Sequence, residues 1–517
     1  MRQWMVAAKK ADFYAIAEKF HVDPVVARII RNREVIGEKN IRIYLGGNLS
    51  DLSDPHQMKD MDRLVEILAQ KIRKQVHIRI IGDYDVDGVT SSHLFLTALR
   101  RVGAKVDVVI PHRIQDGYGL SLHLLQQAKE DGVDTILTCD NGIAAIDEIA
   151  WAKAQKMTVL VTDHHAVPFE EHEGRRTEKK SLADAVVNPH QQDCGYPYKE
   201  LCGAGVAWNV IRVLYENYDM DKREAEDLLD FVAMATVCDV MSLTGENRIL
   251  VKEGLKRIRH TKNIGLQALM QACNVQPENI SAYHFGYVLG PCVNATGRLD
   301  TARHALRLFE TGQETEAEEI ARDLVDLNQE RKELTLQGVE MAKKLCEEGG
   351  YENDPILVLF LPDVHESIAG LIAGRIREMY NRPVFVLTRG EEGVKGSGRS
   401  TENYSMYENM CGCAELFTKF GGHPMAAGLS LPEENVEKFR RKINENCPLT
   451  VEEVCPDIHI DMAMPVGYAS TELVHQFALL EPFGKDNPSP LFADRNLSIS
   501  RMWVIGKNRN VLRMSVL

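Results

Sequence analysis

The sequence predicts an α/β protein with a parallel, doubly wound sheet, then a connector helix, a second, smaller α/β domain and a partial β-barrel of the oligonucleotide-binding type. Three observations predict this class. From Val76 onwards, short runs rich in β-branched residues alternate with amphipathic stretches, which is the pattern of strands joined by crossover helices. A long charged stretch interrupts this alternation, which then restarts. With 517 residues, of which 44% are hydrophobic, the chain can bury more than one core.

The first two segments are a helical lead-in and the larger α/β domain. Residues 1–75 are expected to be helical, because IAEKF, VVARIIRNR and MDRLVEILAQKI space their apolar residues by three and four. Residues 76–312 are expected to form the sheet domain, and its helices continue from residue 204 to residue 310. Its strands are predicted at VHIRIIG, VDVVI, TILTC, MTVLVT and DAVVN.

The later segments are a connector, the second domain and a β-rich end. Residues 313–349 are expected to form one helix with a narrow apolar stripe, made of Ile320, Leu324, Leu327, Leu334, Met341 and Leu345. Residues 350–450 carry the second alternation, in PILVLFL, IAGLIAGRIREMY and PVFVLT. Residues 457–517 contain LSISRMWVIG and VLRMSVL between turn residues, and we expect them to form an incomplete barrel.

Composition excludes several classes of protein. The net charge of −14 argues against a chain that holds nucleic acid through a globally basic surface, although a local basic groove stays open. The 11 cysteines lack the short spacings of a disulfide framework or a structural zinc site, so we expect reduced thiols in the cytoplasm. Charged residues interrupt every apolar run before it reaches the roughly 18 residues of a membrane span, so we expect no export and no membrane.

Acidic and imidazole side chains follow the predicted strands. VHIRIIG is followed by Asp83, Asp85 and Asp87, and TILTC is followed by Asp140. MTVLVT is followed by Asp163, His164 and His165, and the apolar helix FVAMATVCDV carries Asp239. Because ligands bind outside the carboxyl ends of parallel strands, these side chains are predicted to gather at one edge of the sheet.

A cluster of carboxylates needs cations, since like charges in a partly desolvated site repel one another strongly. Asp and His ligands without thiolate suit Mn²⁺ or Mg²⁺, and two such ions sharing a carboxylate serve displacement at phosphorus. Singly, a strand-terminal Asp is more often a helix cap or a turn residue. D-Y-D-V-D-G also opens like a calcium-binding loop, but its twelfth position is Leu94 instead of Glu.

Several motifs resemble a known family. I-I-G-D-Y-D-V-D-G-V-T-S, C-D-N-G, T-D-H-H and V-C-D-V resemble the four motifs of the DHH phosphoesterases. H-E-S-I-A-G-L-I-A-G-R, K-G-S-G-R-S and F-G-G-H-P-M-A-A-G resemble their associated domain, which closes over the substrate. G-P-C-V-N-A-T-G-R-L-D and L-E-P-F-G-K-D-N-P-S-P-L-F resemble the RecJ exonucleases, and this resemblance covers essentially the whole chain.

The resemblance implies roles for individual residues. It implies that Asp85 and Asp140 hold one metal ion, and that the second is held by Asp87, Asp140, His164 and Asp239. It makes Asp83 an auxiliary carboxylate and His165 a contact to the scissile phosphate. The residues implied to bind substrate are Arg113, Ser397 and Arg399 at the 5′ end, with Arg298 and His423 at the phosphate. Two positions depart from the family pattern, namely Cys292 in place of Arg and Ser367 in place of Gly.

The expected activity is hydrolysis of single-stranded DNA. With two Mn²⁺ or Mg²⁺ ions, the chain is expected to release mononucleotides from the 5′ end, in DNA repair and recombination. Single-strand-binding protein and a helicase are the further partners that the resemblance implies. The alternative is a DHH phosphodiesterase acting on short oligonucleotides or cyclic dinucleotides, although such enzymes usually need only the two α/β domains. The intact ligand motifs argue against a silent scaffold.

The C-terminal segment offers candidate contacts to a long single strand. Phe492 and Trp503 are possible stacking surfaces, although a tryptophan at this position is equally suited to a barrel core. The cations of this segment are Lys485, Arg495, Arg501, Lys507, Arg509 and Arg513.

Overall fold

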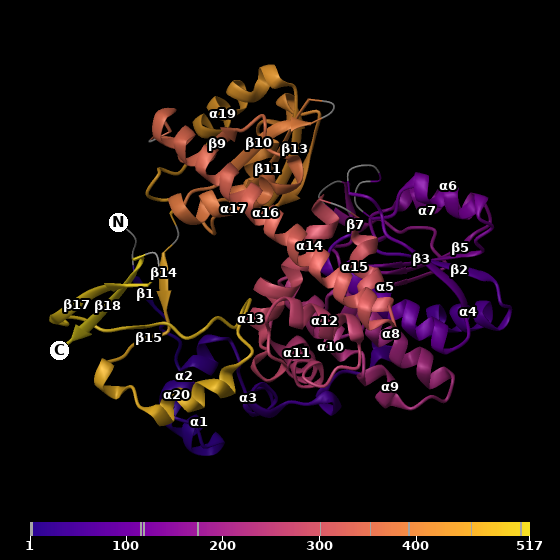
Figure 1. The fold of residues 1–517 in the computed structure, drawn as a ribbon, viewed down its shortest axis with the longest axis horizontal. Coiled ribbons are helices and arrows are strands. Elements are labelled where there is room, and N and C mark those ends of the chain that lie inside the picture. Colours follow the sequence, from indigo (N-terminus) through magenta and orange to yellow (C-terminus); the bar gives the residue numbers. More distant parts are fainter. Residues whose placement is uncertain are drawn as a thin grey trace. The chain divides into compact units, whose positions relative to one another are not determined.

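The computed structural model describes residues 4–113, 116, 119–172, 175–299, 301–351, 353–390, 393–455, 457–506 and 509–517. The chain divides into two compact units, and Figure 1 labels the elements of both. Unit 1 is Met1–Gly46, Asp457–Glu481 and Asn487–Leu517, and unit 2 is Gly47–Pro456 and Pro482–Asp486.

A 5-stranded parallel sheet, in the order β3-β2-β4-β5-β8, forms the centre of the first half of unit 2. The predicted strands are confirmed as β2 (His77–Ile81), β3 (Lys105–Val109), β4 (Thr135–Cys139), β5 (Thr158–Thr162) and β8 (Ala185–Val187). After β3 the chain returns to the other side of β2. The carboxyl ends of β2 and β4 are therefore neighbours at a topological switch point, where ligands of such sheets bind.

Helices cover both faces of this sheet, which confirms the doubly wound arrangement (Figure 1). Ile80 and Leu137 point to the face covered by α4 (Met61–Arg73), α5 (Val86–Arg101) and α8 (Gly203–Asn217). Ile81 and Ile136 point to the opposite face, which is covered by α6 (Leu122–Glu130) and α7 (Ile146–Ala154). A two-stranded hairpin of β6 (Phe169–His172) and β7 (Arg175–Glu178) follows β5.

Helices fill residues 203–310, as the sequence predicts. They are α9 (Lys222–Glu226), α10 (Leu229–Cys238), α11 (Gly245–Ile258), α12 (Ile264–Ala272), α13 (Ala282–His284), a π-helical turn (Phe285–Leu289), α14 (Gly290–Leu299) and α15 (Ala302–Glu310). Residues 482–486 also belong to unit 2, where the Leu243 amide donates to the Lys485 carbonyl over 2.9 Å.

The predicted connector is the single helix α16 (Glu314–Glu348), which links two hydrophobic cores. Ile320 and Leu324 are buried in the core of the sheet domain, whereas Val339 and Ala342 are buried in the core of the second domain. The stripe prediction is wrong at Met341, whose side chain is exposed. Small residues form the buried face there, because α17 (Glu366–Tyr380) packs closely enough that a Cβ atom on Gly338 would lie 2.3 Å from Ile372.

The second domain contains a 5-stranded mixed sheet in the order β12-β13-β11-β10-β9. Its strands are β9 (Leu357–Phe360), β10 (Val384–Gly390), β11 (Gly393–Arg399), β12 (Lys419–His423) and β13 (Ala426–Leu431). Strands β9 and β10 are parallel, and the other pairs are antiparallel. Its helices are α17 (Glu366–Tyr380), α18 (Met406–Cys411) and α19 (Val436–Glu445).

Unit 1 joins the first helices of the chain to its C-terminal segment. The Arg33 guanidinium forms a bidentate pair with the buried Asp461 carboxylate, with N–O distances of 2.7 and 3.0 Å. The Tyr44 hydroxyl donates to Asn487 over 2.7 Å. The elements are α1 (Phe13–Phe20), α2 (Pro24–Asn32), α3 (Glu38–Gly46), α20 (Thr471–Phe477) and the pairs β1 (Trp4–Val6) with β14 (Ile458–Ile460), β15 (Met462–Ala463) with β16 (Phe492–Ala493), and β17 (Ile499–Ile505) with β18 (Val511–Val516).

Trp503 lies on β17 with 41% of its surface exposed, and the Arg513 guanidinium stands 5.8 Å from its ring centre. Within unit 1, Trp503 is therefore a surface residue instead of part of a barrel core. Lys507 lies outside the described residues. No helix in the described parts of the chain combines the length and the apolar character needed to cross a membrane.

Candidate metal centre and adjoining cavity

The turn after β2 places three aspartates at the switch point. Asp85 is the N-cap of α5 and accepts a hydrogen bond from the Gly88 amide over 3.0 Å. The Asp87 carboxylate, in the first turn of α5, accepts from the amides of Gly203 at 2.6 Å and Ala204 at 2.8 Å. These amides begin α8, so the positive end of that helix fixes the Asp87 carboxylate.

Asp140, directly after β4, has the left-handed backbone conformation, with φ of 62°. Asp and Asn tolerate this conformation better than most residues. Its amide donates to the Thr162 carbonyl over 3.1 Å, which fixes the turn to β5. Gly203 allows α8 to approach, because a Cβ atom there would lie 2.6 Å from the Asp140 Cβ. The Asp140 carboxylate is thereby held between the ends of β2 and β5.

His164 meets three of the predicted ligands. Its Nε2 atom lies 3.1 Å from Asp140 Oδ1, 3.5 Å from Asp239 Oδ2 and 3.6 Å from Asp87 Oδ2. Asp239 is the C-cap residue of α10, which delivers its carboxylate from the helical part of unit 2. The predicted ligands therefore come together from four elements that are distant in the sequence.

The ligand atoms form three overlapping groups, in each of which they lie within 4.8 Å of one another. Asp140 belongs to two of the groups, and His164 is also shared by two. Each group can supply part of the coordination of one ion, and the shared carboxylate suits a bridge between neighbouring ions. The groups are Asp83 with Asp85 and Asp140, Asp87 with His164 and Asp239, and Asp140 with His164 and His165.

Electrostatic repulsion is strong in this cluster. Burial, followed by repulsion from neighbouring carboxylates, raises the pKa of Asp83, Asp140 and Asp239 well above the usual range. Burial and the charge of Asp87 raise the pKa of Asp85 in the same way. These groups therefore release their protons less readily than ordinary aspartates, and a bound cation would favour their charged forms.

The donor atoms fit a divalent metal ion. Both carboxylate oxygens of Asp83 and the Nε2 atom of His164 are buried and make no hydrogen bond within the described residues. Buried polar atoms of this kind normally have a partner, so their convergence fits the coordination of a divalent cation. Carboxylate oxygen with one or two imidazoles is a donor set that suits Mn²⁺ or Mg²⁺.

Asp163 orients the second histidine. Its buried carboxylate accepts hydrogen bonds from His165 Nδ1 at 2.8 Å and from the amides of His164, His165 and Ile143 at 2.7, 3.0 and 2.9 Å. Burial opposes the charge on His165, but the bond to Asp163 outweighs it and raises the pKa of His165 to about 9. His165 is therefore a fixed imidazolium beside the cluster in the metal-free protein.

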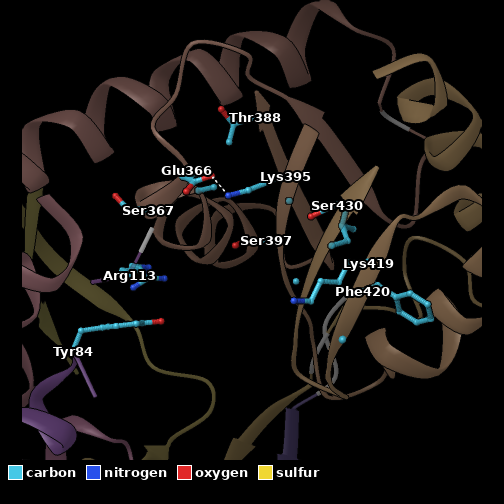
Figure 2. A pocket seen from close by; sticks show the side chains of 15 residues that line it. Tyr84, Arg113, Glu366, Ser367, Thr388, Lys395, Ser397, Lys419, Phe420 and Ser430 are labelled. Carbon is cyan, nitrogen blue, oxygen red and sulfur yellow. Dashed lines mark ion pairs between the residues drawn. The ribbon is translucent and has the colours of Figure 1, made fainter. Parts of the chain in front are cut away.

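A cavity of about 450 Å³ lies between the turn after β2 and the sheet of the second domain, within unit 2. Figure 2 shows Tyr84 and Arg113 on one side of it, facing the residues of α17, β11, β12 and β13. Its lining includes the predicted Arg113 and Ser397, the Glu366–Lys395 ion pair of 2.8 Å and Lys419. Arg113, Lys395 and Lys419 are cations of this lining, and such groups suit an anionic ligand.

Three arginines gather beside this cavity. The Arg298 guanidinium donates to the carbonyl of Ser367, a lining residue, over 2.6 Å. Burial, followed by repulsion from Arg113 and other guanidinium groups, lowers the pKa of Arg298 to about 10. Burial and Arg113 also lower the pKa of Arg399. The predicted His423 lies at the exposed end of β12 and is not among the residues that line the cavity in the described structure.

Four residues of the site and the cavity have no role predicted from the sequence. Asp163 was visible in T-D-H-H but lacked an assigned role, and Lys395 is the first residue of K-G-S-G-R-S. Lys419 had no motif, because its place in the lining depends on the pairing of β12 with β13. Glu366 belongs to the motif H-E-S-I, but the sequence gives no sign of its ion pair with Lys395.

Three family models match separate parts of the chain. The N-terminal domain of the DHH family matches residues 77–236, the DHHA1 domain matches residues 353–447, and the RecJ OB domain matches residues 460–517. The single-stranded-DNA-specific exonuclease RecJ of Haemophilus influenzae is 34% identical over 95% of this chain and 86% of its own length. The chain belongs to the RecJ family. The expected resemblance is thus confirmed.

Other RecJ proteins agree with this assignment. The Bacillus subtilis RecJ exonuclease is 33% identical over 97% of the chain, and the chain spans 62% of that relative's length. A crystal structure of Thermus thermophilus RecJ in complex with Mn²⁺ matches with a TM-score of 0.84 and 27% identity, over 99% of this chain and 72% of that one. The predicted fold class, with its parallel-sheet domain, helical connector and C-terminal OB domain, is confirmed by these matches.

Proposed function

We propose that this RecJ-family chain is a metal-dependent exonuclease that hydrolyses phosphodiester bonds of single-stranded DNA from the 5′ end and releases mononucleotides, in DNA repair and recombination. One observation carries the proposal. The carboxylates and imidazoles at the switch point form overlapping ligand groups, in which Asp140 and His164 each belong to two groups. A cavity lined by cations lies in the same unit. The relatives named as single-stranded-DNA-specific exonucleases support the substrate, and those with bound Mn²⁺ or Mg²⁺ support the ions.

The ligand assignment follows the overlapping groups. Asp85 and Asp140 would hold one ion, with Asp83 as an auxiliary carboxylate beside it. Asp87, Asp140, His164 and Asp239 would hold the other. When bound, two such ions supply a water of lowered pKa and neutralise charge on the phosphate oxygens. The amides at the start of α8 hold the Asp87 carboxylate in position, so it would not need to reorient when an ion binds.

His165 acts on the phosphate group directly. Its imidazolium is fixed by Asp163 and lies with Asp140 and His164 in one ligand group, so it can donate a hydrogen bond to a phosphate oxygen. Loss of the Asp163 hydrogen bond would free the ring to rotate and would lower its pKa.

The arginines beside the cavity would determine the end of the strand at which hydrolysis begins. Arg113, Arg298 and Arg399 repel one another, and a terminal phosphate would relieve this repulsion. Ser397, on β11, lines the same cavity and can donate a hydroxyl hydrogen bond to that phosphate. A 5′ phosphate held there would set the first phosphodiester bond at the metal centre, so cleavage would begin at the 5′ end.

The alternative substrates, short oligonucleotides and cyclic dinucleotides, are not favoured. The relatives named as exonucleases match along nearly the whole chain, including the RecJ OB domain at residues 460–517. A small-substrate phosphodiesterase would not need that domain.

The test uses three substrates of equal length, namely 5′-labelled single-stranded DNA, duplex DNA and RNA, incubated with the full chain and Mn²⁺. We expect labelled mononucleotides from single-stranded DNA alone, and none with Asp140→Asn. Labelled products longer than a mononucleotide, which would arise from internal cleavage or from shortening at the 3′ end, would overturn the proposal. Products from a cyclic dinucleotide without products from DNA would favour the alternative.

Partners and location extend this proposal. A blunt duplex offers no single strand, so we propose a helicase that exposes one and a single-strand-binding protein that keeps it open. A purified helicase that leaves the rate on duplex DNA unchanged would count against that partner. Eleven free cysteines favour the reducing cytoplasm, and fractionation of cells tests this location.

A further inference from the structure

Two cysteine side chains meet where three helices of unit 2 come together. Cys273 is the C-cap residue of α12, and Cys292 lies in the first turn of α14. Their sulfur atoms are 3.8 Å apart. Cys292 is 2% exposed, whereas Cys273 is only partly buried, so small solutes can approach the pair from the Cys273 side.

The surroundings of Cys292 are polar for a buried thiol. Asn328, which is itself 3% exposed, donates from Nδ2 to the Cys292 sulfur over 3.3 Å from α16. The hydrogen bond from Cys273, with that from Asn328 and the nearby charge of Lys332, lowers the pKa of Cys292, whereas the same hydrogen bond, with burial, raises the pKa of Cys273. As a thiol, Cys292 donates to the Val288 carbonyl over 3.3 Å. Two thiols in a purely apolar core would keep their protons, and the thiolate is the reactive form.

The α12 side of the contact can move. Cys273 ends its helix, and the next residue, Asn274, already has the left-handed conformation that terminates helices, with φ of 55°. A disulfide needs the sulfurs about 2.05 Å apart, so closing the gap requires a displacement of less than about 2 Å. The end of a helix can absorb such a displacement more easily than its middle.

We propose that Cys273 and Cys292 form a reversible disulfide under peroxide and that this bond slows hydrolysis of DNA. One thiolate attacks hydrogen peroxide, which breaks the O–O bond and leaves a sulfenic acid and hydroxide. The second thiol attacks the sulfenic sulfur, forms the S–S bond and releases water, while hydroxide takes up the remaining proton as water. Overall, two thiols are oxidised and one peroxide is reduced to two waters.

The effect on hydrolysis rests on the proposed function and on two contacts of α14. Asn294 Oδ1 accepts from the Val86 amide over 3.2 Å, beside the aspartates that follow β2. Arg298 donates to the Ser367 carbonyl at the cavity. The end of α12 absorbs only part of the displacement, and the remainder would draw Cys292 and α14 towards α12 and disturb both contacts. A misplacement of about 1 Å can cost roughly 10²-fold in rate.

The experiment oxidises the metal-free full chain with hydrogen peroxide, removes the peroxide with catalase and alkylates the remaining thiols with iodoacetamide. Mass spectrometry of the digest then locates the modified cysteines. We expect a linked peptide pair containing Cys273 and Cys292, which dithiothreitol separates. The linkage should be lost in Cys273→Ser and kept in Cys411→Ser, which removes an exposed cysteine elsewhere in the chain.

Rates are measured after Mn²⁺ is added, before and after reduction. We expect the oxidised wild type to hydrolyse single-stranded DNA roughly 10–100-fold more slowly than the reduced wild type and to recover with dithiothreitol. The Cys273→Ser variant should keep its rate after treatment with peroxide. Alkylation of both cysteines after peroxide would overturn the disulfide, and a linkage without a change of rate would overturn its effect on α14. A reduced wild type without activity would instead contradict the proposed function, because the mass analysis does not depend on catalysis.

Discussion

Replacing Asp87 should cost stability as well as activity, because its carboxylate has two functions. Besides its place among the candidate ligands, it accepts hydrogen bonds from the Gly203 and Ala204 amides at the start of α8. Both amides are buried, and each buried donor left without a partner costs about 1–3 kcal/mol. Asp87→Ala removes both partners, but it also relieves repulsion on Asp140. We expect a net loss of about 2–4 kcal/mol.

The assay separates the two functions by comparing three variants in urea with a chelator present. Asp87→Asn keeps an acceptor for one amide but turns an NH2 donor towards the other, so it should also lose stability, by about 1–3 kcal/mol. Asp140→Asn is the matched control, because asparagine tolerates the left-handed backbone and removes a buried like charge. We expect Asp140→Asn to unfold at the same urea concentration as the wild type or above it.

The same three variants are then tested for hydrolysis with saturating Mn²⁺. All should lose activity, although only the Asp87 variants should lose stability. Equal urea midpoints for Asp87→Ala and Asp140→Asn would refute the capping of α8 by Asp87. Near-wild-type turnover in Asp140→Asn would refute the shared carboxylate.

Three further substitutions test separate parts of the chain. Burial raises the pKa of Asp230 to about 6 from 3.8, so ionisation destabilises the fold as pH rises through about 4 to 6. Asp230→Asn should therefore add up to about 3 kcal/mol at pH 8, a gain that disappears below about pH 4 in urea titrations. Arg399→Ala should weaken the binding of 5′-phosphorylated strands by about 1.5–3 kcal/mol more than it weakens the binding of 5′-hydroxyl strands. Arg389 is exposed and paired with Glu433, so Arg389→Ala is the control and should show no such difference. Trp503→Ala should weaken binding of long single strands by about 1–3 kcal/mol in anisotropy titrations and spare very short ones, whereas equal losses would indicate a structural role.

The sheet and the metal centre could be predicted because strand-ending residues obey a simple rule. Side chains that follow parallel strands gather at one edge, so Asp83, Asp85 and Asp140 could be grouped without knowing the tertiary structure. Asp239 could be grouped with them because it is a carboxylate among apolar neighbours in FVAMATVCDV, but its role as a metal ligand came only from the family resemblance, since a helix end carries no such rule. Which of these carboxylates also supports the backbone depends on contacts between elements, so the hydrogen bonds of Asp87 could not be predicted.

Predictions were weaker where position depends on packing between distant segments. His423 matched a family motif, but the pairing of β12 with β13 leaves it at an exposed strand end. Met341 fitted the helical spacing, but small residues beside α17 turn a different face of α16 inwards. The pairing of the first helices with the C-terminal segment has no local signal, because Arg33 and Asp461 are paired across most of the chain.

That pairing changes how the C-terminal segment should be tested. Truncation near Cys455 would remove Asp461 and Asn487, and would leave the Arg33 guanidinium and the Tyr44 hydroxyl without their partners. Loss of DNA binding in such a truncation would then report unfolding of unit 1 as readily as loss of a contact to DNA. A surface substitution such as Trp503→Ala avoids this ambiguity.

The charges of unit 2 explain how a chain of net charge −14 can act on a polyanion. Carboxylates are gathered at the switch point and guanidinium groups beside the cavity, and each cluster shifts its own pKa values through burial and mutual repulsion. A divalent cation relieves the first repulsion, and a phosphate relieves the second. Such local fields do not require a basic surface elsewhere. Binding should therefore depend on a few contacts near the 5′ end, and its salt dependence should be shallow unless unit 1 also contacts the strand.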